Sequence, residues 1–240
     1  MKKVVLLTMC VLCLGTTWAQ KRVGQLSFIP RVGLNLSNLG DMDIYTAIDF
    51  NKEDILKAKS RPDFMLGADV EYQLMAPLGI SVGAYYSRQG CRWADFSSVT
   101  IDNDKTKRTE STQDFALKFQ YINVPVSAKL YLNDFFAVHA GLQAGFAING
   151  NMHSVNSVLM EPKVGETVFT SESYDEEMKD MNPLVLSIPL GVSMEYDHVI
   201  LDARYNIPLS RFSNLKNPLD GSYIYKGGNR VWTISVGYRF

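Results

Sequence analysis

The most constraining feature of this chain is the strict alternation of its last ten residues, 231–240. Every second side chain is apolar, and two residues is the period at which side chains share one face of a β-strand. The apolar face consists of Trp232, Ile234, Val236, Tyr238 and Phe240, and the other face of Val231, Thr233, Ser235, Gly237 and Arg239. The pattern predicts a strand with one apolar side.

Seven further segments show the same period of two. They cover residues 26–38, 64–74, 80–87, 121–130, 136–148, 186–196 and 199–207. Their lengths are close to the ~9–11 residues that a tilted strand needs to cross a bilayer. The sequence therefore offers eight candidate membrane-spanning strands.

The connections between these segments alternate in length. Short turns are expected near residues 75–78, 133–134 and 197–198, and long polar links over residues 39–62, 91–118, 149–181 and 210–228. This alternation is typical of an up-and-down barrel with turns on one side of a membrane and loops on the other. We predict an all-β fold, an eight-stranded antiparallel up-and-down transmembrane β-barrel of OmpA or OmpX size. Both termini should lie on the short-turn, periplasmic side.

The composition of the two faces distinguishes a barrel in lipid from a water-soluble one, whose apolar face would point inward. The polar face is rich in small residues: Gly33, Gly67, Ser81, Gly83, Ser127, Gly141, Gly145, Ser187, Gly191, Ser193 and Gly237. Small side chains suit a narrow interior better than a solvated exterior. The apolar face carries aromatic residues near both ends: Phe28, Tyr72, Phe136, Tyr196 and Tyr238 towards the turns, and Phe64, Tyr86, Phe146 and Trp232 towards the loops. Two aromatic belts around an aliphatic band favour an exterior that faces lipid.

Eight charged residues fall at positions that would then point inward. They are Arg31, Asp69, Glu71, Lys129, Glu195, Asp202, Arg204 and Arg239, four basic and four acidic. Buried charges must be paired, because desolvating an ion costs several kcal/mol. Arg31 is expected to pair with Asp69 or Glu71, and Asp202 or Arg204 with Arg239 and Glu195. Closure of the barrel would bring Arg239 beside Arg31, which requires an acid between them.

This balanced set has two interpretations, a proton or ion path and a structural network that fills the lumen. Eight strands enclose an interior only wide enough for side chains. We therefore favour the structural network and predict no open aqueous pore.

The first 19 residues have the pattern of a secretory signal peptide. A basic start, an apolar run from Val4 to Leu14 and a small residue at Ala19 predict cleavage after Ala19. The remaining domain, residues 20–240, would lose Lys2 and Lys3, so its formal charge would move from −1 to −3. This net negative charge does not indicate a positively charged surface that would bind nucleic acid.

Cysteine and histidine are scarce in this chain. Cys10 and Cys13 lie within the apolar run without the spacing of a lipidation site, and Cys91, at the start of a long link, is expected to be an incidental thiol. The predicted topology separates His139 in a strand, His153 in the third long link and His198 in a turn. They cannot converge, so we predict no metal site, no cofactor and no other catalytic or binding residue.

Three features of the long links are candidate sites. Some eight-stranded outer-membrane barrels modify lipid A with a His and a Ser or an acid, and His153 with Ser154 and Ser157 is the one candidate. Residues 102–104 begin like a calcium loop, but Lys107 and Gln113 stand where such a loop needs Gly and Glu. The third link is acidic, with Glu161, Glu166, Glu172, Asp175, Glu176, Glu177 and Asp180. Solvated loops explain all three better, so the chain is not expected to be an enzyme.

Four segments carry a resemblance to the outer-membrane β-barrel family typified by the PorT-like proteins of Bacteroidetes. They are residues 31–38 (RVGLNLSN), 121–126 (YINVPV), 140–145 (AGLQAG) and 236–240 (VGYRF). The resemblance implies an outer-membrane location, and PorT itself is associated with the type IX secretion system. A last strand that ends on Phe240 is similar to the one that outer-membrane barrels present to their insertion machinery.

The expected function is structural or adhesive. A monomeric barrel with a closed lumen would contact outer-membrane lipids, and its long loops would contact an extracellular or envelope protein. Two alternatives stay open: a narrow channel or carrier for small or apolar solutes, and an accessory component of a PorT-like secretion system.

Overall fold

The computed structural model describes residues 22–40, 44–49, 52–102, 106–214 and 227–240. The predicted signal peptide, with Cys10 and Cys13, lies outside these residues. So do Asn103 and Asp104 of the candidate calcium loop, and residues 215–226 of the fourth link. No helix long and apolar enough to cross a membrane occurs in the part of the chain that is described.

The described residues form twelve β-strands. They are β1 (Leu26–Leu39), β2 (Ile44–Asp49), β3 (Lys52–Leu56), β4 (Lys59–Met75), β5 (Leu78–Arg92), β6 (Phe96–Ile101), β7 (Lys107–Tyr131), β8 (Phe136–Glu161), β9 (Val168–Glu177), β10 (Leu184–Tyr196), β11 (Val199–Pro208) and β12 (Asn229–Tyr238). Eight of them pair in a closed antiparallel ring, in the order β1, β4, β5, β7, β8, β10, β11, β12. The predicted eight-stranded barrel is confirmed.

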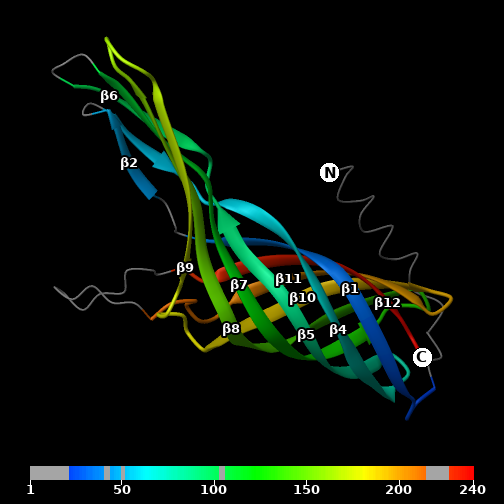
Figure 1. The fold of residues 1–240 in the computed structure, drawn as a ribbon. Coiled ribbons are helices and arrows are strands. Elements are labelled where there is room, and N and C mark those ends of the chain that lie inside the picture. Colours follow the sequence, from blue (N-terminus) through cyan, green and yellow to red (C-terminus); the bar gives the residue numbers. More distant parts are fainter. Residues whose placement is uncertain (1–21, 41–43, 50–51, 103–105, 215–226) are drawn as a thin grey trace, which may run out of the picture.

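Two pairings close the ring. β1 pairs with β12 from Arg31 opposite Gly237 to Leu39 opposite Asn229. β7 pairs with β8 along nearly its whole length. Because every ring strand has a neighbour on both sides, its backbone amides and carbonyls are paired without water, as lipid requires. The first described residues, before β1, and the C-terminus lie at the end of the barrel opposite the long connections (Figure 1), as predicted.

The long connections contain more β-structure than expected. β7 and β8 continue beyond the barrel as an arm, in which β6 pairs with β7 and β9 pairs with β8 (Figure 1). The β2–β3 hairpin lies in the first long link. Residues 107–114 of β7, for example, are polar on both faces (KRTESTQD). A strand with water on both sides shows no apolar alternation, so the period of two could not reveal these strands.

The orientation of the two faces confirms that the apolar face points outward. On β1, Val32 is 57% exposed, whereas the neighbouring Arg31 is 3% exposed. The predicted aromatic belts lie on the exterior, with Phe28 and Tyr238 exposed towards the turns and Phe64 and Trp232 exposed towards the loops. This arrangement is the inverse of a water-soluble barrel and requires lipid around the wall.

A charge at the middle of this wall should therefore destabilise the protein. Val32 lies midway between the belts, opposite Val236 and Leu66. We expect Val32→Arg to lower the free energy of unfolding in lipid vesicles by about 2–4 kcal/mol, measured by urea titration with tryptophan fluorescence. Val99→Arg is the matched control, because Val99 is also about half exposed but lies on β6 in the arm. Equal losses in both variants would contradict a lipid-facing wall.

Candidate functional site: the barrel interior and the base of the arm

A cluster of ionised side chains occupies the middle of the barrel, supplied by four different strands. Asp202 of β11 is its centre and is 1% exposed. Its Oδ2 lies 2.8 Å from His139 Nε2 and 3.9 Å from Arg31 Nη1, and its Oδ1 lies 3.4 Å from Arg204 Nη2. Arg31 Nε also donates to Asp69 Oδ2 over 2.7 Å. One aspartate thus links two arginines and a histidine.

A second cluster lies nearer the turns. Glu71 of β4 accepts hydrogen bonds from Lys129 Nζ over 2.7 Å and from the Tyr131 hydroxyl. Arg239 Nη1 lies 3.1 Å from Glu71 Oε1. Arg239 also forms a bidentate pair with Glu195, through Nε at 2.7 Å and Nη2 at 3.0 Å. Bidentate pairs of this kind combine strength with geometric specificity.

The ion pairs of the lumen agree with the sequence prediction in part. Arg31 pairs with Asp69, as predicted. The predicted pairing of Asp202 with Arg239 is wrong: Asp202 lies beside Arg204 in the middle cluster, and Arg239 pairs with Glu195 instead. Arg31 and Arg239 do not share one acid: Asp69 and Asp202 neutralise the first, and Glu71 and Glu195 the second.

Inward glycines provide the space for these clusters. A Cβ on Gly191 would lie 2.5 Å from the His139 ring, and one on Gly83 would lie 2.3 Å from Asp69 Oδ1. Neither distance is compatible with van der Waals packing. The small residues of the inner face are therefore needed for the volume of their charged neighbours, as the sequence suggested.

Towards the loops the interior changes from charged to neutral. Asn35 donates to Ser87 Oγ over 2.8 Å and accepts from Thr233 Oγ1 over 2.8 Å. Above this layer lies an apolar cluster, which consists of Leu39, Cys91, Trp93, Leu117, Phe119, Tyr121 and Phe212. Phe212 comes from the connection after β11, and its ring centroid is 5.6 Å from that of Phe119.

The prediction that Cys91 begins a loop is wrong. Cys91 lies within β5, is fully buried and belongs to this apolar cluster. The interruption of the alternation around Gly90, whose φ is +149°, hid this continuation of the strand. Sequence reasoning also missed Phe212, because a single aromatic residue in a polar link gives no sign of where it packs.

The three histidines are separate, as the topology predicted. His139 lies in the middle cluster, and His198 lies in the β10–β11 turn. His153 lies on β8 in the arm, with Nδ1 2.9 Å from Asp175 Oδ1 of β9. Asp175 is a partner that the sequence did not reveal, because it is brought opposite His153 by strand register.

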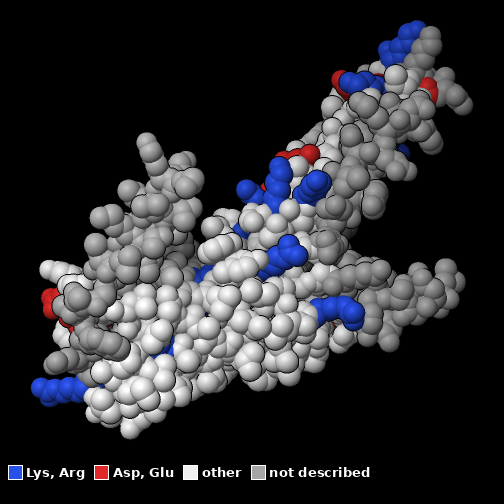
Figure 2. All heavy atoms as spheres, turned by 180° about the vertical axis from the view of Figure 1, so that it is seen from behind, with Lys and Arg blue, Asp and Glu red and all other residues white. Residues whose placement is uncertain are grey.

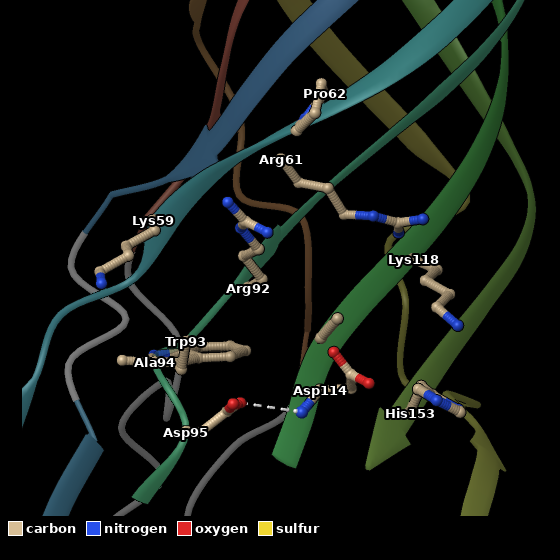
Figure 3. A pocket seen from close by; sticks show the side chains of 11 residues that line it. Lys59, Arg61, Pro62, Arg92, Trp93, Ala94, Asp95, Asp114, Lys118 and His153 are labelled. Atoms are coloured by element: carbon tan, nitrogen blue, oxygen red, sulfur yellow. Dashed lines mark hydrogen bonds between the residues drawn. The ribbon is translucent and has the colours of Figure 1, made fainter. Parts of the chain in front are cut away.

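Basic side chains gather where the arm leaves the barrel (Figure 2). A pocket of about 610 Å³ opens there between β4, β5, β7 and β8. Its lining consists of Lys59, Arg61, Pro62, Arg92, Trp93, Ala94, Asp95, Asp114, Ala116, Lys118 and His153 (Figure 3). No sequence pattern reveals this basic pocket, because its lysines and arginines come from three separate strands, β4, β5 and β7.

Four acidic residues of the third link lie on a strand of the arm. Glu172, Asp175, Glu176 and Glu177 lie on β9, which is exposed along its whole length. Nowhere in the described part of the chain do three or more His, Cys, Asp or Glu side chains gather in a group that could hold a metal ion.

A closed ring of strands with an apolar exterior and ionised groups inside defines an integral outer-membrane β-barrel protein. The chain belongs to the family described as "Outer membrane protein beta-barrel domain", whose model matches residues 18–214. It is therefore a protein of the outer membrane. No curated protein matches this chain.

Several solved structures are similar to this chain at low identity. The attachment invasion locus protein Ail of Yersinia pestis is 17% identical, with 91% of this chain and 99% of that chain covered and a TM-score of 0.39. Neisserial surface protein A is 13% identical, with coverage of 88% and 95% and a TM-score of 0.33. The outer membrane protease OmpT of Escherichia coli is 11% identical, with coverage of 90% and 96% and a TM-score of 0.23. With TM-scores this low, these similarities support no conclusion about the function of this chain.

The middle cluster should contribute strongly to stability through Asp202. Asp202→Asn leaves Arg31 and Arg204 in excess inside the barrel, and we expect a loss of about 3–5 kcal/mol in the free energy of unfolding. Glu161→Gln is the control, because it breaks the exposed pair with Lys107 in the arm. Exposed pairs contribute about 0–1 kcal/mol. Urea unfolding in vesicles measures both, and a loss below that of the control would contradict the role of Asp202.

Proposed function

We propose that this protein is a monomeric surface-interaction barrel whose arm contacts a protein partner outside the cell. One observation carries the proposal: all ten residues of β9 are exposed, and among the described strands β9 pairs only with β8. Its other edge therefore presents free backbone donors and acceptors. Such an edge can accept an extended segment of another protein as an additional strand.

The side chains of β9 support this assignment. Val168 and Phe169 are 53% and 66% exposed, and Tyr174 is 49% exposed. Apolar and aromatic side chains next to a free edge supply contact area for a partner. The acidic end of the strand, from Glu172 to Glu177, favours a partner with basic residues there.

We further propose that the lumen is closed. Two ion-pair clusters, a neutral hydrogen-bonded layer and an apolar cluster follow one another from the turns to the loops. An ion crossing this series would have to break buried pairs and then pass apolar side chains. The barrel is thus proposed to hold the arm in place rather than to conduct.

A catalytic role is not part of the proposal. His153 has an orienting carboxylate in Asp175, but neither Ser154 nor Ser157 is within reach of its ring. Ser154 is the next residue of β8 and points to the opposite face. Ser157 lies four residues along the strand, about 13 Å away at ~3.3 Å per residue.

The partner contact can be tested by site-specific photo-crosslinking in cells. A photoreactive residue at Tyr174 is expected to give a discrete adduct, because this position lies on the exposed strand β9. The double substitution Val168→Lys/Phe169→Lys should reduce the adduct at least about fivefold, since lysines at a strand edge oppose the addition of another strand. Val99→Lys, on β6 at the other edge of the arm, is the matched control.

Three outcomes decide between the proposal and its alternatives. No adduct at Tyr174, or equal loss in the control, would reject β9 as the contact strand. An adduct that co-purifies with a large envelope complex would favour the secretion accessory of the PorT-like resemblance. An adduct with one extracellular protein would support the adhesive role.

Conductance tests the closed lumen separately. Purified protein in planar bilayers is expected to give no unitary currents, because the interior charges are mutually paired. Reproducible unitary currents from the unmodified protein would instead favour the narrow channel.

A further inference from the structure

We propose that the basic pocket at the base of the arm binds a phosphate monoester carried on a sugar. The pocket is lined by four permanently cationic side chains, Lys59, Arg61, Arg92 and Lys118. The assignment goes beyond the surface-interaction role and does not rest on it, because these four residues lie on β4, β5 and β7 rather than on β9.

Three of the four cations have no counter-ion among the described residues. Arg61 Nη2 lies 3.2 Å from Asp63 Oδ2. Within the described residues, Lys59, Arg92 and Lys118 form no ion pair, which contrasts with the paired cations of the lumen. Unpaired cations that converge on one cavity supply what an anion requires.

The charge of the pocket matches a dianion. Arg61 and Arg88 share Asp63 and so keep one positive charge between them. Lys59, Arg92 and Lys118 stand against two carboxylates of the lining, Asp95 and Asp114, which brings the excess to two positive charges. His153 is already paired with Asp175 and is not counted. A phosphate monoester carries about −1.5 to −2 near neutral pH.

Strand register brings these groups together. Lys59 is opposite Arg92, Arg92 is opposite Ala116, and Ala116 is opposite His153, so one row crosses four strands. Ala116 is the short member of this row and leaves space between the longer side chains. Because the row lies on paired strands, backbone hydrogen bonds fix the points at which these side chains leave the sheet.

The two carboxylates lie apart from the guanidinium groups. In Figure 3, Arg61 and Arg92 lie on one side of the pocket, and Asp95 and Asp114 lie on the other. Asp114 has a φ of +52° at an irregularity of β7, and its amide donates to Asp95 Oδ1 over 3.1 Å. Carboxylates are poor neighbours for phosphate but good acceptors for sugar hydroxyls. The pocket thus has one side for a phosphate and one for a sugar.

The volume agrees with a ligand larger than a single oxyanion. A cavity of about 610 Å³ lies within the ~300–1,000 Å³ range of small-molecule sites. The pocket also lies near the outer aromatic belt: Lys59 is five residues from Phe64 on β4, about 16 Å along the strand. The same phosphosugar chemistry could therefore come from a glycolipid headgroup or from a soluble phosphosugar.

Calorimetric titration of the folded, detergent-solubilised protein tests this site with glucose 1-phosphate, glucose and inorganic phosphate as probes. We expect saturable binding of glucose 1-phosphate and none of glucose up to ~10 mM. Arg92→Gln and Lys118→Gln should each weaken binding roughly 10–100-fold, as expected when a charged hydrogen bond is lost. Lys107→Gln is the matched control, because it removes the same charge from β7 outside the pocket.

The sugar side is tested by Asp95→Asn, which can still accept the Asp114 amide hydrogen. We expect this variant to weaken glucose 1-phosphate binding roughly fivefold and to leave inorganic phosphate binding within about twofold. Equal losses for both ligands would overturn the sugar assignment. The unboiled gel mobility of each variant confirms that the barrel has folded.

A lipid ligand in the same titration distinguishes the two possible sources of the phosphosugar. Monophosphorylated lipid A in mixed micelles should bind more tightly than glucose 1-phosphate if the ligand is a glycolipid, and no more tightly if it is soluble. Absence of saturable glucose 1-phosphate binding, or equal weakening by Lys107→Gln and Arg92→Gln, would overturn the proposal. None of these outcomes depends on an adduct at β9, so the two proposals fail separately.

Discussion

Closure of the backbone hydrogen-bond ring is the constraint on which the rest of this structure depends. In hydrocarbon an unpaired amide or carbonyl costs several kcal/mol, so a sheet can cross the membrane only if its first and last strands meet. Here β1 meets β12, and β7 meets β8. Once the ring is closed, side chains of one face have only lipid to contact, and those of the other have only one another. The inverted distribution of apolar and polar residues follows directly.

Closure of the ring confines charged side chains inside the barrel, and the interior accommodates them by pairing them with one another. Seven of the eight predicted inner charges are buried in the narrow lumen and Glu195 is partly buried beside Arg239, so an unpaired ion there would be costly. Asp202 and Glu71 each contact more than one cation, so a few acids satisfy a three-dimensional network rather than isolated pairs. Inward glycines such as Gly191 make the necessary space. This network, the polar layer at Asn35 and the apolar cluster at Phe212 give the barrel a stable base for its arm.

The arm shows what changes when strands leave the membrane. β7 and β8 continue beyond the wall, but water can now satisfy backbone groups, so the sheet no longer has to close. The strands β6 and β9 form the two edges of the sheet, and polar residues occur on both of its faces. An unpaired cation also costs less free energy there, because solvent screens its charge. The partner strand and the phosphosugar pocket are both proposed in this region for the same physical reason.

The sequence by itself determined the barrel, its eight spanning strands, the direction of its faces and the identity of its inner charges. These properties follow from the two-residue alternation of side chains, which can be read from residues that are neighbours in the sequence. It could not determine the arm, where strands solvated on both faces lose that period, or the choice of Asp202 as the centre of a cluster with Arg31, His139 and Arg204. Nor could it place Phe212 over Phe119 or bring Lys59, Arg92 and Lys118 into one pocket. Those contacts depend on cross-strand register and chain reversal, which join residues far apart in sequence, and only the closed tertiary structure fixes them.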